Sequence, residues 1–479
     1  MRLVAGVFVV FVIGCSNSEP EVCKVVCAAD VDCPSGQTCG PLGRCTAGQL
    51  CPCEANELLG CIDDGATSLS CNATSDGVTS ESCTFGCNDA SKQCNACAPS
   101  TSSCSNDALE TCGDDGVIAS SVTCSLSCVD GTATRPAHCG YVAPRFLPDV
   151  CDEVASAEEI VFGSAVTFDT GLDTSCTGGI IVQASGPEIC VVRAKRIAVT
   201  ASLRAIGSRA LALVADDSLE ITAPLDASGR GGTRGAGGYA TSGTRAGANT
   251  GGGGAGFSVA GAAGGMDGVG DGSPGGSVLV LSDVFQGGPG AQGPTNNQST
   301  QGYPAGAGGG GGGLMLVACR GAATISSNVL VNGGGGGGGK MVIFAGQTTY
   351  VGGAGGGAGG VILIEALRAN VTGNLYANGG GGGAGCGLVN CTGGVGQDGQ
   401  TSTTPATGGL PDPNGGNGGA GGTTTMPTAG QGVPSGLGSG GGGGASAGYL
   451  ILLTPRTEDV VAAPAQTSPV LDRGTATIR

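Results

Sequence analysis

A repeating unit of apolar residues constrains the fold of this chain more than any other feature. In residues 211–229 an apolar run is followed by an alternating run, a further apolar pair and a glycine. The same order of residues recurs in residues 189–207, 314–333 and 361–379. Each unit contains strand patterns without a helical period and is too small to bury its own apolar face, so neighbouring units must stack. We therefore predict an all-β fold, a parallel β-helix or solenoid-like repeat domain.

The strands of this predicted domain are almost continuously apolar. The clearest runs are residues 277–281, 314–318, 341–345, 361–364 and 449–453. Such runs are typical of strands that are covered on both faces. One face can point into the solenoid, but no helical periodicity is present to provide a cover for the other face. Residues 160–168 and 179–184 are predicted to form early turns of the stack.

Glycine makes up 100 of the 479 residues, well above the usual share of about 7%. It is concentrated in residues 229–276, 287–313, 333–339, 352–360 and 379–448. These tracts could be flexible linkers, because glycine loses the most freedom on ordering. Alternatively, they could be extended left-handed threads with three residues per turn, packed side by side as only glycine permits. Because the tracts leave and re-enter each unit at the same point, we favour at least partial order, with the threads as the missing cover.

The N-terminus has the pattern of an export signal. Met1 and Arg2 precede an apolar run over residues 3–13, which is too short for a membrane span and suits a signal-peptide core. The run ends in Val-Ile-Gly-Cys-Ser at residues 12–16, which resembles a bacterial lipobox with valine in place of the usual leucine. The resemblance implies that Cys15 is the lipid attachment site, after removal of residues 1–14. The alternative is an ordinary secretory leader with a chance cysteine.

The cysteines predict an oxidising compartment and a disulfide framework. Of 25 cysteines, removal of Cys15 leaves 25 − 1 = 24, an even number that allows full pairing. Most lie in residues 23–151, where two units repeat the same spacing, Cys61, Cys71, Cys83, Cys87, Cys94 and Cys104, Cys112, Cys124, Cys128, Cys139. Each unit carries an Asp-Gly pair (Asp76-Gly77 and Asp115-Gly116), a hairpin signal. We predict two β-hairpin modules stapled by disulfides.

Other cysteines allow more than one interpretation. Metal binding through pairs such as Cys51/Cys53 or Cys94/Cys97 competes with disulfides, but structural zinc needs four thiolate or imidazole ligands at settled spacing. We therefore predict no metal site. Cys190 and Cys319 stand among the aliphatic strand residues and could be small buried hydrophobes or a bridge. Cys386 and Cys391 share one loop and are predicted to pair.

Two stretches match catalytic motifs, but the residues around them lack what each motif requires. Residues 334–340 superficially match a phosphate-binding loop, but Met341 stands where Ser or Thr must hold magnesium. Residues 444–448 match a nucleophile elbow around Ser446, yet the chain has one histidine, His138, and it lies in the disulfide segment. We predict no catalytic residue and no cofactor.

Charged residues also bear on function. Those of the strand units are predicted to alternate outward as a solvated face: Arg193, Lys195, Arg196, Arg204, Asp216, Asp217 and Glu220. Two alternatives to a structural role remain open. A carbohydrate-active β-helix enzyme would bring several of these residues together in a groove, although the chain has no tryptophan to stack on sugars. A calcium-dependent adhesin would use Asp267 and Asp271, although the calcium-binding nine-residue repeat is not sustained.

The lipobox, the cysteine hairpins and the unit at residues 361–380 together resemble the Cys-rich, Gly-rich surface lipoproteins of myxobacterial type. The glycine tracts are also similar to PGRS-type domains of mycobacterial surface proteins. The resemblance implies a location rather than a reaction: an outer-membrane or cell-surface protein held by its lipid. The net charge of −17 disfavours nucleic acid as a partner, whereas surface or matrix polymers remain possible partners.

We thus expect a non-enzymatic, lipid-anchored surface protein with a structural or adhesive role. Its predicted parts are a signal peptide (1–14), a lipidated linker (15–22), disulfide-stapled repeats (23–151), a glycine-rich β-solenoid (152–453) and a frayed polar tail (454–479).

Overall fold

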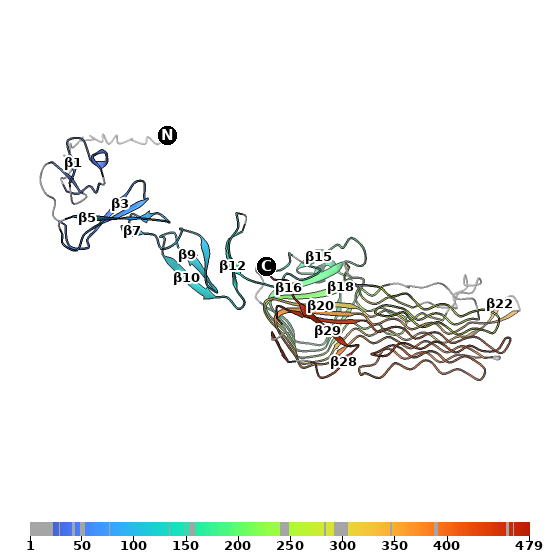
Figure 1. Ribbon diagram of the computed structural model, residues 1–479. Helices are drawn as coiled ribbons and strands as arrows, with labels where there is room; N and C mark the ends of the chain where they lie inside the picture. The colour runs from blue at the N-terminus through green and yellow to red at the C-terminus, as the bar shows by residue number, and fades with distance from the viewer. Residues whose placement is uncertain are drawn as a thin grey trace, which may run out of the picture. The chain divides into compact units, whose positions relative to one another are not determined.

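The computed structural model describes the chain as almost entirely β-structure (Figure 1). The residues described are 23–27, 29–40, 44–47, 53–75, 77–133, 135–147, 149–152, 159–239, 249–281, 284–291, 305–344, 347–387, 391–456, 459–462 and 464–479. Their helical elements are short 3-10 turns, among them Asp30–Asp32 and Asp173–Ser175. No helix in this part of the chain is both long and apolar enough to span a membrane. The all-β prediction is confirmed.

The chain divides into two compact units, Met1–Cys139 and Gly140–Arg479, and each is described by itself. The boundary therefore lies before Cys151 rather than after it. The reason is a disulfide: Cys151 bonds to Cys319 and so belongs to the second unit. Residues 140–151 were wrongly grouped with the cysteine-rich segment because one sequence cannot show which cysteines pair.

The first unit opens with a small disulfide knot. Its strands β1 (Thr38–Cys39) and β2 (Cys45–Thr46) pair antiparallel, and the bridges Cys27–Cys39 and Cys33–Cys45 close it. Each of the cysteines that the structure describes is disulfide-bonded. An oxidised framework is therefore the organising feature of this unit.

Two modules follow, each built from a three-stranded antiparallel sheet and a short hairpin. The first contains β3 (Leu58–Ile62), β4 (Thr67–Cys71), β5 (Val78–Ser82), β6 (Cys87–Asn88) and β7 (Gln93–Cys94). The second contains β8 (Ser102–Ser105), β9 (Ala108–Cys112), β10 (Ile118–Thr123), β11 (Cys128–Val129) and β12 (His138–Cys139). Gly116 adopts φ +73° in the turn between β9 and β10, as the Asp-Gly signal requires. The prediction of two hairpin modules is confirmed.

The two modules share one disulfide connectivity. The bridges Cys53–Cys71, Cys61–Cys87 and Cys83–Cys94 of the first correspond in order to Cys97–Cys112, Cys104–Cys128 and Cys124–Cys139 of the second. All residues of β5 and β10 are exposed, so these strands bury little apolar surface. The core of the first module is small and consists of Leu59, Ile62 and Leu69. Because each bridge typically contributes about 2–4 kcal/mol, the disulfides supplement the limited core of such small modules.

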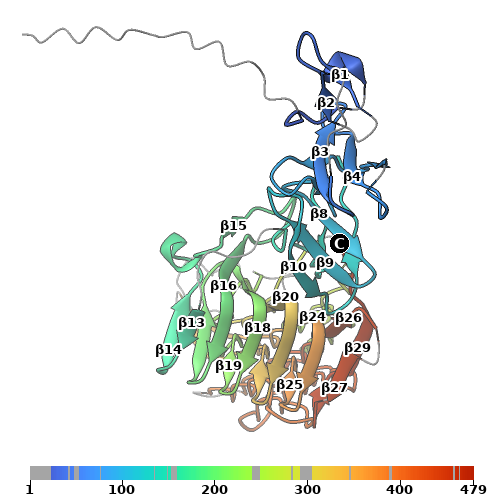
Figure 2. The same ribbon diagram turned by 90° about the vertical axis from the view of Figure 1, so that its left-hand side faces the viewer.

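The second unit contains two large parallel sheets (Figure 2). In the described residues, the larger sheet has the order β13-β16-β18-β20-β24-β26-β29, with β15 antiparallel to β16 and β27 parallel to β24. Its strands are β13 (Glu159–Phe162), β15 (Gly179–Ile181), β16 (Ile189–Val199), β18 (Ala210–Ile221), β20 (Gly313–Ile325), β24 (Val361–Val371), β26 (Tyr449–Thr454), β27 (Val460–Ala462) and β29 (Leu471–Thr475).

The smaller sheet runs β14-β17-β19-β21-β25-β28 and is parallel throughout. Its strands are β14 (Val166–Asp169), β17 (Leu203–Ile206), β19 (Leu225–Asp226), β21 (Val329–Leu330), β25 (Leu375–Tyr376) and β28 (Thr467–Ser468). Each predicted repeat unit therefore forms one long strand of the larger sheet, a turn and one short strand of the smaller sheet. The register aligns equivalent residues, as in Ile221 beside Ile325 and Ile325 beside Val371.

The larger sheet is buried on both faces, as its continuous apolar strands predict. Alternate residues such as Leu211, Leu213 and Ile362 pack between the two sheets. The residues between them, such as Ala212 and Leu363, pack on the opposite face. The cover on that face combines the segment around Tyr141 and Leu147 with two aromatic residues, Phe257 in a glycine-rich tract and Phe285 just before the next one. The predicted glycine cover is thus supplemented by large side chains that fill the space glycine cannot.

The described glycine tracts are ordered as threads that bond to one another with a three-residue period. Along the thread at residues 352–360, every third amide donates to the same neighbour: Gly353 to Gly440, Gly356 to Gly443, Gly359 to Ser446, each at 3.0 Å. The next amides donate to another thread: Ala354 to Gly337, Gly357 to Gly334, Gly360 to Val331. Such a period is that of an extended helix with three residues per turn. The linker alternative is therefore wrong for these tracts.

Close packing explains why the threads consist of glycine. A Cβ atom added to Gly353, Gly356 or Gly359 would collide with a carbonyl oxygen of a neighbouring thread. All residues of the thread at 352–360 are buried, although glycine has no side chain and alanine only a methyl group. Backbone hydrogen bonds and backbone contacts therefore take the place of a side-chain core.

Several local predictions are wrong. Residues 341–345 are not a strand of the stack, because β22 (Met341–Phe344) pairs antiparallel with β23 (Gln347–Tyr350) in a hairpin of its own. Residues 277–281 are not a strand, and residues 179–181 pair antiparallel to the stack. The tail is not frayed: β27, β28 and β29 join the two sheets and close the core with Val460 and Leu471.

The remaining cysteines of the second unit are bonded. Cys190 pairs with Cys176 and Cys319 with Cys151, which decides between the two interpretations in favour of bridges. The predicted pair Cys386–Cys391 is confirmed.

Candidate functional site

The predicted lipid attachment residue, Cys15, lies outside the described residues, as do the predicted signal peptide and linker. The site therefore stays a prediction. The candidate sites that can be built from the structure are the charged residues of the strands, a buried glutamate, a cysteine cluster and two hollows in the surface.

The charged residues of the strands pair between neighbouring strands. Basic residues of β16 and β17 meet acidic residues of β18 and β19: Arg193 with Asp216 at 3.5 Å, Lys195 with Asp217 at 3.9 Å, Arg196 with Glu220 at 3.2 Å and Arg204 with Asp226 at 2.7 Å. Arg204 and Asp226 are register partners, whereas Arg193 and Arg196 each reach an acid two positions beyond their register partners, Val214 and Ser218. The residues that a catalytic groove would have to bring together are thus distributed over separate pairs along the sheets.

Asp216 differs from the other acids because its side chain is fully buried. Arg193 and Arg320 both donate to its Oδ1 atom, at 3.5 and 3.3 Å. Arg320 also donates to the carbonyl of Cys151 at 2.7 Å and lies over the ring of Tyr141. Buried charges need such partners because desolvation is costly. This arrangement ties the covering segment around Cys151 to the sheet, which is a structural role.

Glu365 is another buried acid of the larger sheet, with 1% of its surface exposed. It lies in β24 between Val317 and Leu453, and its carboxylate accepts the backbone amide of Arg145 at 3.0 and 3.2 Å. Burial raises the pKa of Glu365 to about 7, although the Arg145 amide and charge oppose this effect. Sequence reasoning missed this residue. The available signal was a glutamate at a strand position where the neighbouring units carry valine.

We expect Glu365→Gln to stabilise the protein at alkaline pH and to have little effect under acidic conditions. A carboxyl whose pKa rises from 4.5 to about 7 on folding stabilises the fold below pH 4.5, and this contribution is lost as the pH rises through 7. The loss amounts to about 3 kcal/mol. Urea unfolding at pH 5 and pH 8 should show a fall in wild-type stability that the variant lacks. The exposed Glu159→Gln is the control and should keep the wild-type slope.

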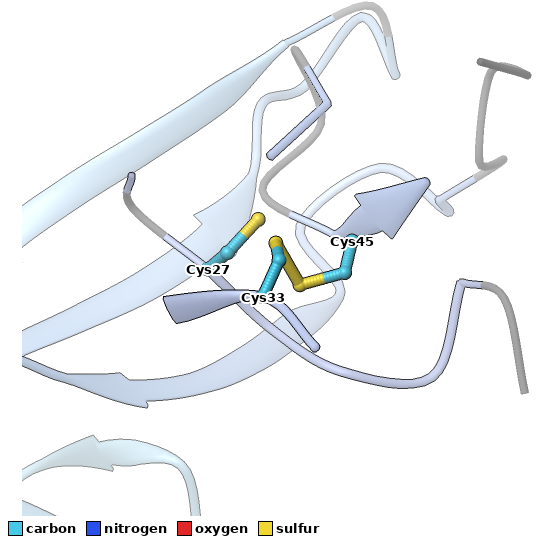
Figure 3. A group of neighbouring side chains, drawn as sticks. All are labelled: Cys27, Cys33 and Cys45. Atoms are coloured by element: carbon cyan, nitrogen blue, oxygen red, sulfur yellow. A yellow bond between two sulfur atoms is a disulfide. The ribbon is translucent and has the colours of Figure 1, made fainter. Parts of the chain in front are cut away.

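The sulfur atoms of Cys27, Cys33 and Cys45 lie close together (Figure 3). Such a group could hold a metal only as thiolates. The bridges Cys27–Cys39 and Cys33–Cys45 use all three sulfur atoms. The cluster is therefore a pair of adjacent disulfides, and its chemistry is structural.

The rejected motifs lie in structural surroundings. Ser446 is fully buried and donates its hydroxyl to the carbonyl of Ala447 at 2.7 Å. Gly334 belongs to a thread, and the strand β22 follows Lys340 where a phosphate-binding loop would need a helix. Asp267 accepts the amides of Val269 and Gly270 at 3.0 and 2.6 Å, so one carboxylate oxygen closes a turn.

The described surface includes two hollows. One, of about 660 Å³, is in the first unit between the knot and the sheet of β3–β5. The other, of about 230 Å³, is in the second unit beside β26 and is lined by Thr423, Thr424, Thr425, Met426 and Tyr449, among others. Neither is lined by the paired charges of the strands.

Comparison with known proteins adds no family: the chain matches no family model, no curated protein and no solved structure.

Proposed function

We propose that this protein is a non-enzymatic, lipid-anchored surface protein with a structural or adhesive role. In this proposal the two parallel sheets are walls of a β-solenoid, and the glycine-rich threads extend it as a rigid body. The disulfide-stapled unit connects this body to a lipid on Cys15 in the outer membrane. The resemblance to Cys-rich, Gly-rich lipoproteins of myxobacterial type supports the location.

The observation that carries the proposal is the interlocked backbone of the threads. Their amides and carbonyls bond from thread to thread, as in the bonds of Gly356 to Gly443 and Gly357 to Gly334. Such a body has few degrees of freedom, which suits a part that must keep its shape outside the cell. The disulfides support the same location, because they persist in oxidising compartments.

The alternatives are less well supported. A carbohydrate-active enzyme needs acids and bases that converge, whereas Asp216, Asp217 and Glu220 share no base with one another. A calcium-dependent adhesin needs free carboxylates, whereas Asp267 holds a turn. Addition of EDTA tests the latter, since a calcium-dependent fold would melt at a lower temperature.

Palmitate labelling in a bacterial host tests the anchor. We expect the wild-type chain to incorporate label and Cys15→Ala to lose it entirely, because the acyl chains need the Cys15 thiol. The neighbouring Ser16→Ala is the matched control and should be labelled. Protease added to intact cells should then remove the wild-type protein from the surface. Label that persists in Cys15→Ala, or a protein protected from the protease, would contradict the anchor or the surface location.

A further inference from the structure

Three glycine-rich threads form one outer face of the second unit. The threads at residues 404–413, 414–423 and 425–434 lie side by side: Gly418 donates to Gly409, Gly421 to Ala406, Thr428 to Ala420 and Gln431 to Asn417. Figure 1 shows the threads of this part of the chain on the lower side of the bundle. We call the solvent-facing side of these three threads the outer face.

The outer face presents its side chains at regular intervals. Every third residue of the first and third threads is exposed: Thr404, Thr407, Leu410 and Pro413, and likewise Thr425, Thr428, Gln431 and Pro434. The three-residue period of an extended thread corresponds to roughly 9 Å. Exposed side chains therefore recur along each thread at a fixed spacing.

The outer face is also uncharged. Between Asp398 and Arg456 the sequence has one charged residue, Asp412, although the whole chain carries a net charge of −17. The Asp412 carboxylate accepts the backbone amide of Thr392 at 2.7 Å, so it bonds within the bundle of threads. Hydroxyl, amide and small apolar groups remain for contact, and these groups hydrogen-bond to neutral partners without the desolvation cost of a charge.

The threads beneath hold the outer face rigid. Gly409 donates to Gly382, Gly419 to Gly442 and Gly430 to Ala263, at 2.8, 2.8 and 3.0 Å. A preformed surface loses little conformational entropy on binding, so many weak contacts can add up. The hollow of about 230 Å³ adjoins this face at Thr425 and Met426 and contains one aromatic residue, Tyr449.

We propose that the outer face docks on a neutral polysaccharide, with the Thr407 hydroxyl donating to and accepting from its hydroxyl groups. The Thr428 hydroxyl and the Gln431 side-chain nitrogen act there as donors, because Thr428 Oγ1 already accepts the Ala420 amide and Gln431 Oε1 already accepts Asn417, both at 2.7 Å. A regular, uncharged, hydroxyl- and amide-bearing surface matches a regular, uncharged, polyhydroxyl polymer. This proposal gives the class of partner for the adhesive role proposed above. It rests on that role, because the protein and the polymer would meet at the cell surface.

Sedimentation of the purified full chain with microcrystalline cellulose and with chitin tests the docking. We expect depletion from solution on at least one polymer, nearly unchanged between low and high salt. The double variant Thr407→Lys/Thr428→Lys should bind about tenfold more weakly, a loss of about 1.4 kcal/mol. Thr348→Lys, at an exposed position of the β23 hairpin, is the matched control and should bind like the wild type.

Several outcomes would overturn the proposal. These are wild-type binding to neither polymer, equal loss in Thr348→Lys, and binding that high salt abolishes. Adsorption to ice crystals without binding to either polymer would show that the outer face binds ice rather than a polysaccharide. Circular dichroism checks that the variants fold, and the single variant Gln431→Lys repeats the test should the double variant not fold. If the protein incorporates palmitate but binds neither cellulose nor chitin, the proposed lipid anchor stands and only the proposed polysaccharide binding is contradicted.

Discussion

Replacing Gly356 with alanine is expected to unfold much of the second unit. Gly356 is buried in the thread at residues 352–360, and a Cβ atom there would collide with the carbonyl oxygen of Gly380. The thread cannot shift away, because the Gly356 amide donates to Gly443 and its carbonyl accepts from Ala255, both at 3.0 Å. We expect a loss of about 3 kcal/mol or more from a single methyl group, the upper range for overpacking. Thermal unfolding followed by circular dichroism measures it.

Gly306→Ala is the matched control. Gly306 lies in the same class of thread, but a Cβ atom added there would meet no heavy atom within 4 Å. Its exposed position predicts a change of at most about 0.5 kcal/mol. Equal melting of Gly356→Ala and the wild type would show that the threads are not closely packed. A large loss in Gly306→Ala would show that alanine disfavours the thread conformation itself.

Aspartate at Val371 or Leu363 is expected to prevent folding of the second unit. Val371 is fully buried between the two sheets, and Leu363 is fully buried on the opposite face of the larger sheet. An aspartate in either place would be an unpaired charge in apolar surroundings, which costs several kcal/mol even after its pKa rises. This loss is comparable to the whole stability of an ordinary domain. We expect both variants to lose the cooperative unfolding transition.

The two positions test different surfaces of one strand. Val371→Asp tests the core between the sheets, and Leu363→Asp tests the cover formed by the threads and the segment around Tyr141. The exposed Ile343→Asp in β22 is the control and should melt like the wild type. A normal melting curve for Leu363→Asp alone would mean that the cover separates easily from the sheet. A normal curve for Val371→Asp would contradict the paired-sheet core.

The repeat was readable because equivalent residues meet in register. Ile221, Ile325 and Val371 occupy the same place in successive units and pair in neighbouring strands. The hairpin of β22 and β23 was not readable, since its apolar run has the composition of a strand within the stack. The strands of the tail were also not readable from the sequence. Few apolar residues are enough to hold β29 in the sheet, because it pairs with only one neighbouring strand, β26.

Among the candidate sites, charge pairing was partly predictable and burial was not. Outward alternation correctly indicated a solvated face for Lys195 and Glu220, which are both about half exposed. Asp216 and Glu365 broke that rule, because the covering segment encloses them. Local sequence carries no information on a cover that comes from residues far along the chain.

By itself the sequence determined the strand units, the disulfide modules and the need for stacking, because these follow from local patterns of apolar residues, cysteines and turns. Only the tertiary structure decided that the described glycine tracts are ordered, which partners Cys190 and Cys319 take, and which acids are buried. The physical reason is that a glycine tract has no side chain to express a preference. Its conformation is set by the hydrogen bonds that neighbouring threads offer, and those exist only when the whole bundle is assembled.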